Sequence, residues 1–190
     1  MFQPIPRPLV LASTSPYRRR LLARLGLLFE TVAPDYDEER NLPLGPRRTA
    51  LHHAHGKAAS VGRPEAIVIG SDQVVALENE ILGKPGTIAG AESQLRRLSG
   101  RRHRLITALV LVDGARLRRH VDTHWVQVRT LSDEEIRAYV ARDRPLDCAG
   151  SYRIEAAGPL IMERIDGADP SAIEGLPLMA LGRLLRELSA

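Results

Sequence analysis

The segment Val10–Leu22, VLASTSPYRRRLL, decides how this chain begins to fold. A short apolar strand stops at a hydroxyl-rich turn, and a helix begins directly behind it. Ser15 is a favourable N-cap and Pro16 suits the first helical position, so the start of the helix is well marked. Three arginines then occupy the opening turn, where the helix dipole is already positive. Backbone N–H groups, hydroxyls and guanidinium groups together suit phosphate, so the segment indicates an anion site; arginines spread into solvent are the alternative.

The order of the other segments predicts an α/β protein with a mixed sheet. We expect strands at about 9–13, 29–33, 66–70, 74–77, 80–82, 104–112, 117–129 and 159–165, and helices at about 16–25, 46–61, 89–98, 132–142 and 176–188. The pairs Glu78-Asn79 and Asp113-Gly114 predict hairpin turns. Ser132 and Glu135 form the pattern of a capping box. The stretch 148–158 is expected to be loop and short helix.

Composition favours one domain, or one domain with two lobes. The chain has 190 residues, of which 44% are hydrophobic and only 4% aromatic, so the core is expected to be mostly aliphatic. No stretch has the length needed to cross a bilayer, and the apolar run Leu9–Ala12 is too short for a signal peptide. Cys148 is the single cysteine and cannot form an internal disulfide. We therefore expect a cytoplasmic protein with no membrane partner.

The basic residues are unusual in kind rather than in number. The net charge is +4 and the pI about 9.7, but 23 acidic residues are interspersed, so a nucleic-acid partner is not favoured. Of the 27 basic residues, Lys57 and Lys84 are the two lysines and the other 25 are arginines. Because a compact ammonium differs chemically from a planar guanidinium, these two positions could require lysine. The alternative is that they are chance survivors of a bias toward arginine.

Four further groups could carry chemistry. They are the acidic loop 35–39, Lys57 on its helix, the lysine of Gly83-Lys84-Pro85, and Asp72, which we expect at the exit of a buried strand. Strand exits in open α/β sheets are where ligands usually bind. Cations with carboxylates suit a polyphosphate, a divalent metal ion and an activated water. A turn-capping Asp72 and a solvated acidic loop are the structural alternatives, and one helix cannot direct all of His52, His53 and His55 at one zinc ion.

Taken in order, these segments resemble the Maf family of nucleoside triphosphate pyrophosphatases over nearly the whole chain. The matching pieces are LASTSPYRRRLL, PDYDE, HGKA, IGSDQVV, EILGKP, RTLSDEEIRAYV, AGSYRIE and EGLPL. The resemblance implies a two-lobed Maf/ITPase-like fold, in which helices flank a mixed, elongated sheet and the nucleotide binds in the cleft between the lobes. It also implies a homodimer and hydrolysis of a nucleoside triphosphate to monophosphate and pyrophosphate, with Mg²⁺ or Mn²⁺.

The resemblance assigns roles residue by residue. The triphosphate would be held by Ser13, Ser15, Arg18, Lys57 and Lys84. Glu38 and Asp72 would hold the metal or polarise water, and Asp72 matches the family's proton acceptor. The expected step is an in-line attack of water on the α-phosphorus, with pyrophosphate leaving toward Arg18 and Lys84.

At three positions the sequence departs from the commoner family pattern, and these positions concern recognition of the nucleobase. Tyr17 stands where many members have arginine, Gln73 where they commonly have threonine, and Glu155 where pyrimidine-specific members tend to have glutamine. These residues resemble the subfamily that hydrolyses 7-methyl-GTP. A carboxylate can accept the N1–H and N2–H donors of guanine, and N7 methylation makes the base cationic, which favours an aromatic face. The alternatives are a dTTP/UTP pyrophosphatase and a non-catalytic regulator that binds nucleotide or nucleic acid and is linked to cell division.

Overall fold

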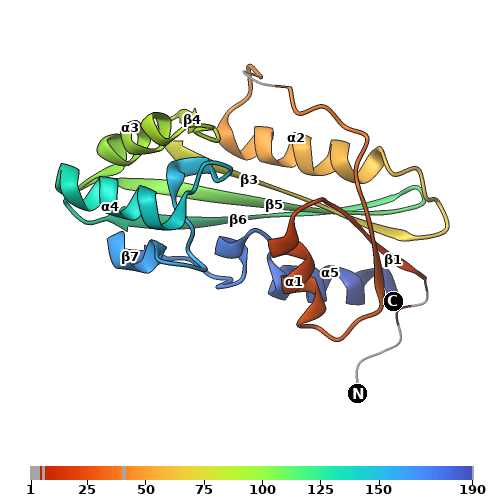
Figure 1. The fold of residues 1–190 in the computed structure, drawn as a ribbon. Coiled ribbons are helices and arrows are strands. Elements are labelled where there is room, and N and C mark those ends of the chain that lie inside the picture. Colours follow the sequence, from red (N-terminus) through yellow and green to blue (C-terminus); the bar gives the residue numbers. More distant parts are fainter. Residues whose placement is uncertain (1–4, 6, 40–41, 190) are drawn as a thin grey trace. The chain divides into compact units, whose positions relative to one another are not determined.

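The computed structural model describes residues 5, 7–39 and 42–189 (Figure 1). The chain divides into two compact units. Unit 1 comprises Met1–Asp72, Thr107–Asp122 and Asp169–Ala190, and unit 2 comprises Gln73–Ile106 and Thr123–Ala168. Among the residues described, none of the helices has the length and apolar character that crossing a bilayer requires.

The strands form a mixed sheet, as the sequence predicts. The strand order is β2-β1-β3-β5-β6-β7, and β4 pairs with β3. The strands are β1 (Leu9–Ala12), β2 (Phe29–Val32), β3 (Ile67–Leu77), β4 (Glu80–Leu82), β5 (Arg102–Asp113), β6 (Arg116–Val128) and β7 (Met162–Asp166). Strand β1 runs parallel to β2 and β3, whereas β4 is antiparallel to β3 and β7 to β6. The expected α/β class is therefore confirmed.

The five helices follow the order that the sequence predicts, and two of them, α1 and α4, begin at the predicted caps. They are α1 (Pro16–Ala23), α2 (Pro46–Ala59), α3 (Ile88–Leu98), α4 (Asp133–Asp143) and α5 (Leu178–Ser189), with 3₁₀ turns η1 (Ala149–Ser151), η2 (Gly158–Ile161) and η3 (Ala172–Glu174). The Ser15 side chain caps α1 and Pro16 is its first residue. Ser132 and Glu135 form both hydrogen bonds of the predicted capping box at α4.

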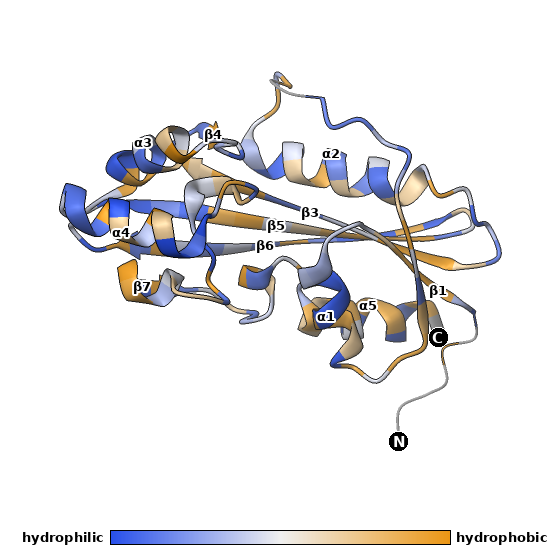
Figure 2. Ribbon diagram, in the orientation of Figure 1, coloured by the Kyte–Doolittle hydropathy of each residue, from blue (hydrophilic) through white to orange (hydrophobic). Residues whose placement is uncertain are grey.

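Unit 1 is layered because side chains alternate along a strand. Leu9 and Leu11 belong to an aliphatic cluster with α1 and α5, and α5 contributes five of its residues (Ala180, Leu181, Leu184, Leu185 and Leu188). Val10 and Ala12 belong to a second cluster that includes Ala58 of α2. In Figure 1, α2 accordingly lies on one side of the strands of this unit and α1 with α5 on the other. Figure 2 shows hydrophobic residues along β1 and α5.

A glycine brings α2 close to β3. A Cβ added at Gly70 would overlap the backbone oxygen of Ala54 and crowd the side chain of Ala58, so only glycine allows this approach. The close packing matters for function because α2 carries Lys57 and β3 carries Asp72.

Unit 2 is held by helix contacts and buried polar pairs. Helix α3 contacts α4 and η1, and the Ser151 hydroxyl donates to Gln94 Oε1 at 2.7 Å. His103 Nε2 of β5 lies 2.9 Å from the hydroxyl of Tyr152. Strands β3 and β4 form the hairpin predicted at Glu78-Asn79, and Glu78 adopts a positive φ of 57° there.

Several predicted bounds require correction, among them the start of α5, which is Leu178 and not residue 176, and the end of α2, which is Ala59 and not residue 61. Strand β3 does not end near Gly70 but continues to Leu77, so Asp72 lies inside a strand and not at its exit. The strand predicted from Pro159 begins instead at Met162, because η2 occupies residues 158–161. Helix α1 ends at Ala23, two residues before its predicted end, and Arg24 caps it.

Candidate active site

Three segments of unit 1 converge because β1 and β2 end in register beside the middle of β3. Ala12, the last residue of β1, is paired with Val32, the last residue of β2, and with Gly70 of β3. The chain beyond these positions contains the turn 13–15, the loop 33–39 and the pair Ser71-Asp72. Asp72 is therefore internal to β3 yet lies just past the end of its neighbour β1. This arrangement preserves the expected ligand-binding edge although Asp72 is not at a strand exit.

A buried lysine bridges two carboxylates at this edge. Lys57 Nζ lies 2.6 Å from Asp72 Oδ1 and 2.7 Å from Glu38 Oε1. The side chains of Lys57 and Asp72 are only 9% and 8% exposed, whereas that of Glu38 is 49% exposed. The buried pair is thus shielded from water, and Glu38 closes the cluster from the solvent side. We call Glu38, Lys57 and Asp72 the acid–lysine cluster.

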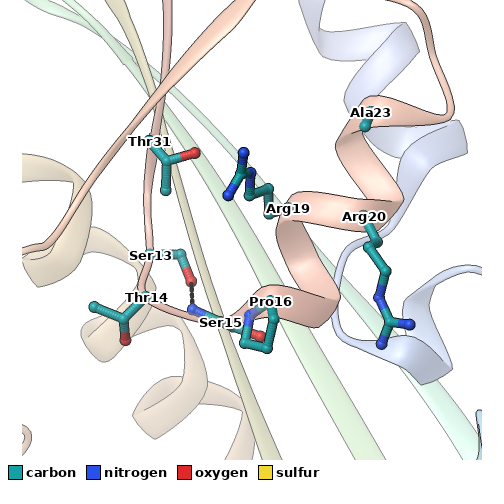
Figure 3. A pocket seen from close by; sticks show the side chains of 8 residues that line it. All are labelled: Ser13, Thr14, Ser15, Pro16, Arg19, Arg20, Ala23 and Thr31. Carbon is teal, nitrogen blue, oxygen red and sulfur yellow. Dashed lines mark hydrogen bonds between the residues drawn. The ribbon is translucent and has the colours of Figure 1, made fainter.

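The turn between β1 and α1 presents hydroxyl and N–H groups. Ser13 Oγ accepts a hydrogen bond from Ser15 N at 3.1 Å, and Ser15 Oγ accepts one from Arg18 N at 3.4 Å. An open pocket of about 380 Å³ lies beside this turn, and Figure 3 shows its lining of Ser13, Thr14, Ser15, Pro16, Arg19, Arg20, Ala23 and Thr31. The start of α1 thus offers the polar groups that phosphate recognition uses.

The three arginines of α1 have different surroundings. Arg18 Nε donates to the backbone oxygen of Gly175 at 3.0 Å, whereas Arg19 and Arg20 are exposed. Burial lowers the pKa of the Arg18 guanidinium, and the carboxylates of Asp72 and Glu38 oppose that shift. Arg18 is therefore the arginine that shares the electrostatic environment of the acid–lysine cluster.

The Arg18 contact was not predicted from the sequence. Gly175 has a φ of 108°, and its carbonyl oxygen also lies 2.9 Å from Ser71 Oγ. The glycine of EGLPL is the signal that the sequence offers, because glycine is favoured where the backbone adopts a positive φ. The backbone oxygen of Gly175 thus orients the Arg18 guanidinium by accepting the hydrogen bond from Nε.

Two residues near the acid–lysine cluster were also missed. The Tyr36 hydroxyl lies 2.9 Å from Nδ1 of buried His53. Burial, followed by the carboxylates of Asp72, Glu38 and Glu39, raises the pKa of Tyr36, so its hydroxyl stays protonated near neutral pH. In the sequence His53 is one of three neighbouring histidines that could suggest a metal ligand, whereas the structure gives it a phenol partner.

Three predicted site residues belong to unit 2. Gln73 is half-buried in β3, Lys84 is exposed in the segment that follows β4, and Glu155 is exposed between η1 and η2. The cluster in unit 1 contains Glu38, Lys57 and Asp72, with Arg18 in electrostatic reach of both acids. Tyr17, also in unit 1, is half-buried, and the Arg20 guanidinium lies 5.2 Å from the centre of its ring.

The fold defines a class of α/β protein that is represented among solved structures. The Staphylococcus aureus Ham1 protein superposes with a TM-score of 0.54 over 95% of this chain and 99% of its own, at 16% sequence identity. This likeness confirms the expected ITPase-like fold. Within that class, residues 8–188 match the family described as Maf-like protein, and the chain belongs to this family. The resemblance seen in the sequence is thereby confirmed.

Several relatives are similar over most of their length. A protein of Aromatoleum aromaticum is 50% identical over 183 residues, covering 94% of both chains. One of Syntrophotalea carbinolica is 43% identical over 91% of this chain and 90% of its own. One of Xanthomonas oryzae pv. oryzae is 47% identical over 94% of this chain and 95% of its own. All three are named 7-methyl-GTP pyrophosphatase.

Proposed function

We propose that this chain hydrolyses 7-methyl-GTP to 7-methyl-GMP and pyrophosphate. The observation that carries the proposal is the acid–lysine cluster beside Arg18 and the hydroxyl-lined turn. Cations and N–H groups are what a triphosphate requires, and a carboxylate next to them can direct a water molecule. The names of relatives that are 43–50% identical support the choice of substrate.

The roles divide between the chain's own residues. Ser13, Ser15, Arg18, Lys57 and Lys84 bind the phosphates, and Asp72 accepts the proton of the attacking water. Lys57 already sits against Asp72, so a phosphate oxygen that draws its ammonium away would leave the Asp72 carboxylate available to water. Gln73, Lys84 and Glu155 are assigned on the family resemblance alone, because they belong to unit 2.

Glu38 and Asp72 fit a divalent cation. The two carboxylates converge on one ammonium, so their oxygens already share a site with positive charge. Across the described ranges, no group of three or more His, Cys, Asp or Glu side chains is arranged to hold a metal ion. Two carboxylates with water and substrate phosphates form a donor set that Mg²⁺ uses, and Mn²⁺ accepts similar oxygen ligands. When bound, such an ion would neutralise charge on the phosphates.

Tyr17, Gln73 and Glu155 are proposed to select the base. The aromatic face of Tyr17 can attract a cationic methylated purine, which would compete there with the Arg20 guanidinium 5.2 Å from the ring centre. Glu155 is exposed and can accept hydrogen bonds from the guanine edge. We further propose that the protein acts in the cytoplasm as a homodimer, without a nucleic-acid partner. Sedimentation of the purified chain would test the dimer.

The proposal is tested by measuring pyrophosphate release from 7-methyl-GTP, GTP, UTP and dTTP with Mg²⁺ or Mn²⁺. We expect 7-methyl-GTP to give the highest kcat/KM. Preference for UTP or dTTP would instead make the protein a pyrimidine nucleotide pyrophosphatase. Binding without turnover, with an affinity that falls steeply as the salt concentration rises, would instead indicate a non-catalytic regulator that binds nucleotide or nucleic acid.

Two variants test the assigned roles. Asp72→Asn should lower kcat by about 10²–10⁴-fold while equilibrium binding of the nucleotide persists. Retained turnover would remove Asp72 from the role of base. Glu155→Gln should reduce kcat/KM for 7-methyl-GTP by at least about tenfold more than for UTP, because it loses a charge-assisted contact. An equal loss for both nucleotides would mean that Glu155 does not read the base.

A further inference from the structure

Glu38 lies on a segment that has no regular structure of its own. Residues 33–39 form neither helix nor strand, so no ladder of backbone hydrogen bonds fixes the Glu38 carboxylate. The side chain is half exposed, yet its Oε1 reaches Lys57 Nζ at 2.7 Å. Other contacts must therefore hold the segment against α2.

Tyr36 supplies those contacts. Its hydroxyl lies 2.9 Å from His53 Nδ1, and the two rings meet edge to face with centroids 5.9 Å apart. The protonated phenol can donate to Nδ1 when the imidazole carries its proton on Nε2. The partner is well placed to hold the ring, because His53 is only 6% exposed.

Gly56 makes room for the same ring. A Cβ added at Gly56 would overlap three carbon atoms of the Tyr36 ring. Glycine in the interior of a helix is otherwise unfavourable compared with alanine. The close approach of the Tyr36 ring explains why a glycine stands at this position in the helix.

The three contacts lie on one face of α2. His53, Gly56 and Lys57 are spaced i, i+3 and i+4, so they form one continuous surface of the helix. Tyr36 covers the first two positions and Glu38 reaches the third, two residues further along the segment. The segment thus docks along the helix in register.

We propose that Tyr36, His53 and Gly56 form a clamp that holds Glu38 at Lys57, and that Tyr36 and His53 are positioning residues for the acid–lysine cluster. The inference rests on the proposed function where it concerns metal binding by Glu38. The docking of residues 33–39 on α2 is independent of any activity.

The first test compares Tyr36→Phe, Gly56→Ala and the control Gly182→Ala. Gly182 also lies in a helix, α5, but a Cβ there meets only the end of the Arg186 side chain at 3.7 Å. Tyr36→Phe and Gly56→Ala should weaken Mn²⁺ binding, measured by electron paramagnetic resonance, by about tenfold. They should also speed amide hydrogen exchange in residues 33–39, whereas Gly182→Ala should change neither. Unchanged exchange and Mn²⁺ affinity in both clamp variants would overturn the proposal.

Combined and alternative substitutions distinguish loss of the clamp from a general effect of the substitutions on helix α2. In a Tyr36→Ala background, Gly56→Ala should have no additional effect on exchange or Mn²⁺ affinity, because no ring remains to be displaced. His53→Asn, which keeps an acceptor near the place of Nδ1, should behave as the unaltered protein, whereas His53→Leu should resemble Tyr36→Phe. A full effect of Gly56→Ala without Tyr36, or equal losses for both His53 variants, would contradict the clamp.

The readouts also separate this inference from the proposed function. If no nucleotide is hydrolysed but the exchange in residues 33–39 responds as expected, the proposed function fails and the clamp stands. If Mn²⁺ does not bind the unaltered protein, Glu38 is not a metal ligand and the metal part of the inference falls. If turnover is normal and the exchange does not respond, the clamp falls and the enzyme remains.

Discussion

Replacing Lys57 by methionine should destabilise the protein in a way that a divalent cation relieves. The substitution keeps a long side chain but removes the charge between Asp72 and Glu38. Removing one partner of a buried ion pair costs about 3–5 kcal/mol, because the other charge is left buried without compensation. Asp72 is 8% exposed and carries this cost, whereas Glu38, at 49%, remains solvated and adds little.

We therefore expect a loss of about 3 kcal/mol in the free energy of unfolding at pH 7. For a chain of this length, that corresponds to a Tm lower by about 6–12 °C. The assay is urea unfolding followed by circular dichroism, with and without Mn²⁺. Mn²⁺ should stabilise Lys57→Met more than the unaltered protein, because the ion supplies the missing positive charge and binds only the folded state.

The other lysine provides a matched control. Lys84 is exposed, so Lys84→Met should change the free energy of unfolding by no more than about 0.5 kcal/mol. The reasoning would be refuted if both variants were equally stable, or if Mn²⁺ stabilised Lys57→Met no more than the unaltered protein. Either result would mean that removing the Lys57 ammonium does not leave a buried, uncompensated charge at Asp72.

Two further predictions concern unit 2. Burial lowers the pKa of His103 from 6.5 to about 4, so the unfolded chain binds this proton more readily than the folded one. Stability from neutral His103 is fully present above pH 6.5 and is lost as the pH falls to about 4, by about 3 kcal/mol in total. In His103→Phe, the difference in unfolding free energy between pH 7 and pH 4 should shrink by about that amount; an unchanged difference would place the acid sensitivity elsewhere. Ser132→Ala removes the cap of α4 and should cost about 1 kcal/mol in urea unfolding, and an unshifted midpoint would show that the capping box adds nothing.

The local sequence is sufficient to predict most of the helices and strands, because the signals for them involve neighbouring residues. The cap at Ser15, Pro16 in the first turn and the capping box at Ser132 and Glu135 depend on contacts within four positions along the chain. The hairpin at Glu78-Asn79 is local in the same sense. Motifs spread over the chain are sufficient to identify the family, and the match of the family model to residues 8–188 confirms this identification.

The arrangement of the candidate site required the tertiary structure. Asp72 was expected at a strand exit, but a strand end depends on the neighbouring strand: β1 stops at Ala12, while β3 continues. The bridge from Lys57 to Glu38 and Asp72 joins residues 19 and 15 positions away in the sequence. No local pattern contains such contacts, because they arise only when α2 packs on β3.

By itself the sequence determined the element types, most of the helix starts, the α/β class and the family, since each is encoded in local spacing or in ordered motifs. Only the tertiary structure decided that Lys57 lies between two acids, that Gly175 orients Arg18, and that Tyr36 rests on His53 and Gly56. The physical reason is that burial and close packing bring together groups whose separation along the chain carries no signal.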